Sequence, residues 1–187
     1  AVAITHPSHG DAMRLILRST EVLSRAASFV EYIEEMLRTI LEQTKAELGA
    51  YIHRREGRLE VVVARDRKGR VERPHINIPV VEWALQKEFP ISSDDVSEDL
   101  RFGQHPSQIA GRLSVLAVPL HSPVGREGVL FLSRVEPAFS EIELQALTAV
   151  GHLAQSGGAR FSQEVKAPYA AGTIIDELGR RAKSQTS

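Results

Sequence analysis

Cysteine is absent from this sequence, and aromatic residues make up only 5% of its 187 residues. The lack of cysteine excludes disulfides, thiolate metal sites, thiol nucleophiles and the thioether attachment of a pigment or haem. An excess of one charge is also missing, because 23 basic and 24 acidic residues leave a net charge of -1. This neutral balance gives no general electrostatic reason to bind nucleic acid or an anionic membrane, so we expect neither partner.

Long apolar runs and targeting signals are missing as well. No window approaches the roughly 18 apolar residues that a membrane span requires. The first residues lack the basic start and the apolar stretch of a signal peptide. The absence of cysteine leads us to expect a cytoplasmic location. The chain begins at Ala1 rather than at a methionine, which suggests a piece of a longer protein.

The residues that are present have the balance of a globular protein, with 42% hydrophobic and 25% charged residues. The length suits one domain with additional helical ends. Residues 1–10 predict a disordered lead, and residues 11–27 predict an N-terminal helix with Asp11 as its N-cap. Ser28 should begin a second helix, and Gly49 stands where a left-handed helix end is expected.

After these two helices the apolar pattern changes to the alternation that is typical of strands. It predicts strands over Ala50–Arg55 and Leu59–Arg65, and a third around His75–Ile78. A helix is predicted over Val80–Glu88, since proline precedes it and its apolar residues share one side. Phe89–Ile91 could form a brief fourth strand.

The second half combines an irregular segment with a buried hairpin. Ser92–Leu113 is polar and broken by glycine and proline, and a loop of this length is more often functional than idle. Ser114–Leu120 and Gly128–Leu132 are apolar runs separated by turn residues, which predicts an antiparallel hairpin with no free face. Ser140 and Glu143 have the spacing of a capping box at the start of the last helix.

The C-terminal region is predicted to contain the end of this helix and a linker. The helix should end near Glu164, because Gly157 and Gly158 weaken it. Residues 166–187 form the linker in this interpretation, with a further helix over Thr173–Lys183 as an alternative.

Several short motifs occur in one order along the chain. They are Pro90-Ile91, Asp99-Leu100-Arg101-Phe102, Arg112 to Leu120, Gly128 to Leu132, and Phe139 to Leu144. Together these motifs resemble GAF domains, most closely the sensory GAF modules of bacterial transcription activators, cyclases and kinases. The resemblance covers about Ser28 to Gln163 and is carried by the combination rather than by any single motif.

The resemblance implies an α+β fold with α/β/α layers, related to the PAS and profilin-like folds. A central six-stranded antiparallel sheet would be flanked by helices, and the GAF-like domain would occupy residues 28–165. The first, second and last helices would cover one face of the sheet. The Val80 helix and the long loop would roof a small-molecule pocket on the other face.

The sequence also departs from the family pattern in several ways. Many GAF domains place an acidic residue after the Gly-Val-Leu strand, where this chain has Ser133-Arg134. The signature of GAF domains that bind cyclic nucleotides is not present in order. The lack of cysteine argues against the bilin photoreceptors and the methionine sulfoxide reductase branch.

The residues expected to bind a ligand come from the roof and the hairpin. They are Trp83, Asp94, Asp95, Arg101, Phe102, Ser107, Leu116 and Val118. Arg101 could pair with a carboxylate or phosphate of the ligand. The favoured alternative is that Arg101 pairs with Asp95 or Asp99 while Phe102 fills the core. Trp83 is equally consistent with a pocket wall and with plain packing of the helix on the sheet.

A catalytic set cannot be assembled from this sequence. Asp94 and Asp95 could act as acid and base or hold a metal, but adjacent residues point in different directions, and capping of loop N–H groups is the favoured interpretation. There is no Gly-x-Ser-x-Gly motif, which argues against a hydrolase triad. We therefore expect no metal site, no cofactor and no enzyme.

Two functions remain from the sequence alone. The first is a sensory or regulatory domain that binds an unknown small molecule and passes its state through terminal helices to an effector domain of a bacterial signalling or transcription-regulating protein. The second is a structural dimerisation module with a collapsed pocket. Both involve a homodimer through the terminal helices. Exposed side chains at Ile16, Leu23, Ile174 and Ile175 would favour the second.

Overall fold

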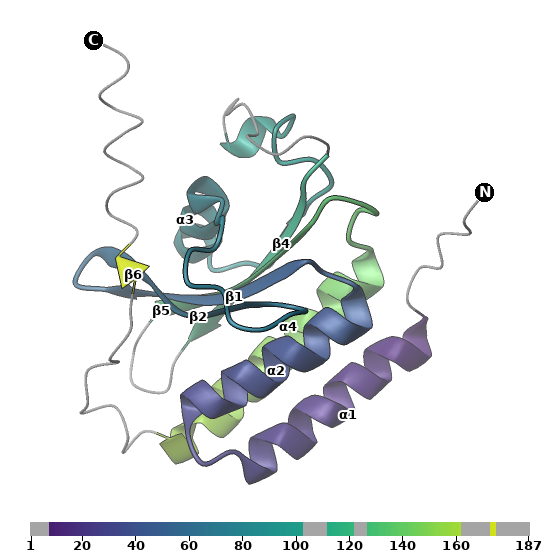
Figure 1. The fold of residues 1–187 in the computed structure, drawn as a ribbon, viewed down its shortest axis with the longest axis vertical. Helices are drawn as coiled ribbons and strands as arrows, with labels where there is room; N and C mark the ends of the chain where they lie inside the picture. Colours follow the sequence, from purple (N-terminus) through teal and green to yellow (C-terminus); the bar gives the residue numbers. More distant parts are fainter. Residues whose placement is uncertain (1–7, 103–111, 122–126, 162–172, 175–187) are drawn as a thin grey trace.

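A computed structural model of the chain describes residues 8–102, 112–121, 127–161 and 173–174. The helices are α1 (His9–Arg25), α2 (Phe29–Thr44), α3 (Ile78–Lys87) and α4 (Glu141–Gly157), with 3₁₀ turns η1 (Leu100–Phe102) and η2 (Gly158–Phe161). Figure 1 shows α1, α2 and α4 on one side of a central sheet and α3 on the other. The predicted α/β/α arrangement is therefore present.

The sheet is antiparallel, with the strand order β3-β4-β5-β1-β2-β6. Its strands are β1 (Leu48–Arg55), β2 (Arg58–Asp66), β3 (Ile91–Ser93), β4 (Ser114–His121), β5 (Glu127–Arg134) and β6 (Thr173–Ile174). The predicted hairpin forms β4 and β5, and β5 also pairs with β1. The hairpin therefore lies inside the sheet, which explains why it has no polar face.

The expected third strand around His75–Ile78 is absent. The Asn77 side chain accepts a hydrogen bond from the Val80 N–H and so begins α3 at Ile78. Residues 48–134 thus supply five strands, and the sixth position is held by the two residues of β6 beside Glu60 and Val61 of β2. The expected six-stranded sheet is not confirmed in its detail. Thr173 and Ile174 are extended rather than helical, and the rest of the expected helix over Thr173–Lys183 lies outside the described residues.

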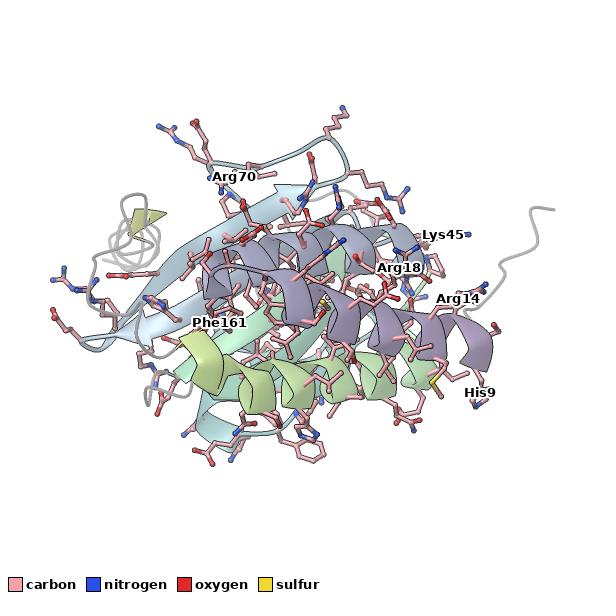
Figure 2. All side chains as sticks on the ribbon, turned by 90° about the horizontal axis from the view of Figure 1, so that it is seen from below. His9, Arg14, Arg18, Lys45, Arg70 and Phe161 are labelled. Carbon is pink, nitrogen blue, oxygen red and sulfur yellow. The ribbon has the colours of Figure 1, made fainter. Side chains whose placement is uncertain are left out.

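The helical layer is closely packed at both ends. Near its C-terminal end α1 meets the end of α4, because a Cβ at Gly157 would lie 2.1 Å from Leu23 Cδ2. At the other end, Leu15 of α1 lies with Ala146 of α4 in the same buried cluster. The two helices therefore run parallel, and Figure 2 looks directly onto them and α2.

Helix caps were predicted with mixed success. The Ser140–Glu143 capping box is present in both directions, with Ser140 N–H donating to Glu143 and Glu143 N–H donating to Ser140. The expected cap at Asp11 was wrong, since Ser8 is the N-cap of α1 and Asp11 is the third residue of its capping box. Ser28 begins α2 as expected, because its hydroxyl accepts from the Glu31 N–H, and the Glu31 carboxylate accepts from the Ala27 N–H.

The ends of two helices also differ from prediction. Helix α2 ends at Thr44, with Lys45 in the left-handed region at φ 56°, whereas Gly49 is part of β1. Gly49 serves close packing there, because a Cβ would lie 2.9 Å from Leu37 Cδ2. Helix α4 ends at Gly157 rather than near Glu164, and one 3₁₀ turn follows it.

Two hydrophobic clusters lie on opposite faces of the sheet. One joins α1, α2 and α4 to the sheet, and the other joins α3 and η1 to it. Strand β4 contributes to both by alternation, with Leu116 and Val118 on the helical side and Val115 and Ala117 on the α3 side. Among the described residues, no helix is long and apolar enough to cross a membrane.

Candidate functional site

An aromatic pair marks the face of the sheet that carries α3 and η1. Trp83 of α3 and Phe102 of η1 meet edge to face, with ring centroids 6.3 Å apart and an interplanar angle of 82°. Phe102 is buried, whereas Trp83 is partly exposed. The guanidinium of Arg101 lies 5.9 Å from the Trp83 ring centroid and 5.2 Å from that of Phe102. Three predicted site residues therefore lie together.

Arg101 is held in this position by Asp99 and by β3. Its Nε donates to Asp99 Oδ1 at 2.9 Å, and its Nη2 donates to Asp99 Oδ2 at 2.6 Å and to the Ser92 carbonyl at 2.9 Å. The hydrogen bond from Arg101 is the main reason why the pKa of Asp99 is lowered to about 2, and the same bond raises the pKa of Arg101. The favoured alternative for Arg101, a pair with an aspartate beside a buried Phe102, is what the structure shows.

The Arg101 side chain still has capacity for a further partner. It is 44% exposed, and its Nη1 makes no hydrogen bond within the described residues. Because Asp99 and the Ser92 carbonyl fix the plane of the guanidinium, this free edge has a defined direction. A planar anion can be bound there without first ordering the side chain.

The adjacent aspartates Asp94 and Asp95 have surroundings that differ from those of Arg101. Asp95 accepts hydrogen bonds from Ser97 N–H at 3.1 Å and Ser97 Oγ at 2.7 Å, and lies 3.7 Å from Arg112 Nε. Asp95 thus caps its own loop, as favoured from the sequence. Asp94 is exposed. Within the described part of the chain, no group of three or more His, Asp or Glu residues could hold a metal ion.

The hairpin residues assigned to the pocket floor lie on the other face. Leu116 and Val118 belong to the cluster beneath the helical layer, so they do not share a space with Trp83 and Phe102. The β4 residues on the correct face are Val115 and Ala117, one position away in each case. Ser107 lies outside the described residues.

A buried ion pair on the helical side was missed by the sequence analysis. Arg134 at the end of β5 donates to both carboxylate oxygens of Glu143, at 2.8 and 2.9 Å. The two side chains are 3% and 2% exposed. Arg134 also donates to the carbonyls of Thr44, Pro137 and Ala138. The signal was present in Ser133-Arg134, where a charged residue ends an apolar strand nine positions before a capping glutamate.

The family assignment rests on more than the arrangement of elements. A family model described as GAF domain matches residues 26–156. The chain belongs to the GAF domain family. No curated protein is similar enough to this chain to count as a match.

Solved structures of GAF domains share this fold at low sequence identity. The GAF domain of a phosphoenolpyruvate-protein phosphotransferase from Coxiella burnetii is 12% identical, with a TM-score of 0.65, over 84% of this chain and 98% of that chain. A GAF sensor protein from Burkholderia vietnamiensis, described as putative, is 16% identical, with a TM-score of 0.62, over 83% and 99%. These similarities establish the fold, and the family is one of sensory and regulatory domains in signalling proteins.

The expectation that this domain is not an enzyme requires correction. The free methionine-R-sulfoxide reductase from Neisseria meningitidis, solved with its substrate, is 18% identical to this chain, with a TM-score of 0.66, over 88% of this chain and 100% of that chain. Enzymes therefore occur among the structures that share the fold. The GAF fold does not exclude catalysis, and the exclusion drawn from the sequence was too strong.

Proposed function

We propose that this GAF domain is a regulatory module that binds a small anionic molecule on the face formed by α3 and η1. The observation that carries this proposal is the half-exposed Arg101 guanidinium, which Asp99 holds beside the rings of Trp83 and Phe102. Its Nη1, which makes no hydrogen bond in the part of the chain that the structure describes, supports recognition of a carboxylate or phosphate group. The aromatic rings supply an apolar surface for the remainder of the ligand.

The arrangement of the layers supports a regulatory role. The proposed site lies on one face of the sheet, and α1, α2 and α4 cover the other face (Figure 1). We place the output in these helices, which would connect the domain to an effector domain of a bacterial signalling or transcription-regulating protein. A ligand can act in this way only if it binds two states of the domain with different affinity.

The proposal is tested by ligand retention and by one substitution. Native mass spectrometry of protein purified from its source should detect a bound acidic molecule. Calorimetric titration with a panel of small carboxylates and phosphate esters then compares the wild type with Arg101→Ala. We expect Arg101→Ala to abolish binding with little change in melting temperature, because the Arg101–Asp99 pair lies near the surface.

A matched control distinguishes the loss of an arginine at the proposed site from the loss of an arginine elsewhere. Arg54 pairs with Glu127 at 3.3 Å and is 35% exposed, so Arg54→Ala removes a comparable ion pair away from the site. Binding should survive Arg54→Ala. A large loss of stability in Arg101→Ala with unchanged binding would assign Arg101 to structure and contradict the proposed site.

The second candidate function is dimerisation through α1. Met13 and Leu17 are each 57% exposed and lie one turn apart on this helix. Two of the residues named for this purpose from the sequence are not exposed, because Ile16 and Leu23 pack against the helical cluster. The side chain of Ile174 and the whole of Ile175 lie outside the described part of the chain. The exposed pair on α1 nevertheless supplies an apolar surface for a second copy of the chain.

A further inference from the structure

A line of polar contacts connects η1 to the sheet edge and continues toward the helices. Arg101 Nη2 donates to the carbonyl of Ser92 at 2.9 Å, and the next carbonyl along β3, that of Ser93, accepts from Ser114 Oγ at 3.1 Å. Ser92 and Ser93 are consecutive residues of a three-residue strand. A displacement of β3 at Arg101 would therefore move the carbonyl to which Ser114 donates.

Ser114 passes this line from β3 to the segment that precedes α4. Its hydroxyl donates to Ser93 and accepts from the Phe139 N–H at 3.1 Å, so both capacities of the hydroxyl are used. Ser114 is fully buried, at 0% exposure. Phe139 comes immediately before Ser140, the N-cap of α4.

Through Phe139 and Arg134 the line of contacts reaches α4 and α2. The Arg134 guanidinium lies 4.1 Å from the centroid of the Phe139 ring. From there Arg134 binds the Glu143 carboxylate in the first turn of α4 and the carbonyl of Thr44 at the end of α2. One cation thus contacts both helix ends.

We propose that these contacts couple η1 mechanically to the junction of α2 and α4. The coupled residues are Arg101, Ser92, Ser93, Ser114, Phe139, Arg134 and Glu143. Only the identity of the trigger, an anion at Arg101, rests on the proposed function. The coupling itself is a property of the chain without ligand.

Physical chemistry favours a stepwise response from such a line. Ser114, Arg134 and Glu143 are buried, so an interrupted hydrogen bond leaves a group without water to replace its partner. Such groups change between discrete arrangements rather than drifting continuously. The two hydrophobic clusters lie on opposite faces of the sheet, whereas this line passes from one side to the other at the β3–β4 edge.

Amide hydrogen exchange tests this coupling without a ligand. Exchange is followed in residues 41–47 and 139–147, with residues 30–38 of α2 as the reference for global opening. Arg101→Ala should speed exchange at both helix ends by about two- to thirty-fold relative to this reference, the range expected for coupled sites. The matched control Arg54→Ala breaks an exposed ion pair elsewhere and should leave both helix ends unchanged.

The central link is tested in a double variant. In a Ser114→Ala background, Arg101→Ala should add no further change at the helix ends, because the line is already interrupted. If Ser114→Ala does not fold, Phe139→Leu replaces it, since it keeps the backbone bond to Ser114 and removes the ring beneath Arg134.

Two results would overturn the coupling. One is a response to Arg101→Ala confined to residues 91–102, and the other is a helix-end response that persists undiminished in the Ser114→Ala background. Failure to find any bound anion would remove the proposed trigger but would leave these exchange results as they are. The two proposals can therefore fail separately.

Discussion

At the scale of single residues, Arg134 and Glu143 form an ion pair whose side chains are only 3% and 2% exposed. Removing both charges from water costs free energy, which their mutual attraction and hydrogen bonds offset only while both partners remain. Glu143→Gln removes the negative charge and leaves Arg134 buried. We expect a loss of about 3–5 kcal/mol in the free energy of unfolding, measured by urea denaturation.

Glu141 provides the control for this substitution. It lies in the same first turn of α4 but is exposed, and it accepts a hydrogen bond from Gln145 at 3.3 Å. Glu141→Gln should cost less than about 1 kcal/mol, the size of a charge effect at a helix end. Equal losses in the two variants would mean that the helix end, not the buried pair, is responsible.

The lowered pKa of Asp99 predicts that the free energy of unfolding depends on pH. Its pKa is lowered from 3.8 to about 2 in the folded protein, mainly by the hydrogen bond from Arg101. The ionised carboxylate therefore stabilises the fold fully above its ordinary pKa, and this contribution is lost as the pH falls through about 2. As the pH falls from 3.8 to about 2, the difference in free energy of unfolding between wild type and Asp99→Asn should shrink.

Carboxyl NMR titration measures the same effect directly. We expect the Asp99 resonance to titrate near pH 2 in the wild type. In Arg101→Ala the main cause of the shift is gone, so the pKa of Asp99 should move up toward its ordinary value. An Asp99 resonance that titrates identically in both proteins would show that Arg101 does not hold the carboxylate.

Residue-level prediction succeeded where the signal was local, since the Ser140 cap followed from spacing alone. Trp83, Arg101 and Phe102 lie together in the structure, and their role in binding a ligand stays a prediction. Leu116 and Val118 were placed on the wrong face, because a strand that is apolar on both sides gives no alternation to orient it. The partner of Arg134 was not predicted because it depends on where β5 ends relative to two helices.

Among the elements, the pairing of β1 with β5 depends on a close approach at one glycine. A Cβ at Gly128 would lie 2.5 Å from Tyr51 Oη and 2.8 Å from Tyr51 Cζ, so the ring would have to move. Tyr51 is buried between the sheet and the helical layer. We expect Gly128→Ala to destabilise the protein by about 1–3 kcal/mol in urea denaturation, as overpacked cores do.

Gly10 offers a comparison at an open position. The atom nearest to a Cβ at Gly10 would be Ser8 Oγ at 3.5 Å, which is ordinary contact. Gly10→Ala should change stability by less than about 1 kcal/mol, in the stabilising direction expected of alanine in a helix. A Gly128→Ala variant as stable as Gly10→Ala would show that Tyr51 has room to shift.

The elements themselves were predictable except where two signals competed. His75–Ile78 has the alternation of a strand, but Asn77 and Pro79 together provide the start of a helix, and the helix start prevailed. Gly49 has the residue type of a helix end, yet close packing in β1 requires it. The first conflict is decided by the local cap between Asn77 and Val80, and the second by packing against Leu37 of α2.

For the molecule as a whole, the layers separate two surfaces with different chemistry. The α3 and η1 face carries an oriented cation beside two aromatic rings, and the opposite face carries a helical layer with α1 outermost beside α2 and α4 (Figure 2). These layers were predicted from the resemblance to GAF domains. The surface through which two copies of the chain would associate could not be predicted, because it depends on which apolar side chains remain exposed after folding.

The proposed dimer is therefore best tested on α1. Met13→Glu combined with Leu17→Glu places two charges on the exposed side of this helix without touching its buried residues Leu15 and Val22. We expect a wild-type dimer in sedimentation velocity and a monomer for the double variant, because charges buried without partners oppose association. Circular dichroism should show the same helix content in both.

Phe89 and Leu100 supply the matched control for that experiment. They are 65% and 82% exposed but lie outside the helical layer, after α3 and in η1. Phe89→Glu combined with Leu100→Glu should leave the dimer intact if α1 forms the interface. A dimer that dissociates only with this second pair would move the interface to the proposed ligand face, and a wild-type monomer at every concentration would exclude dimerisation through either surface.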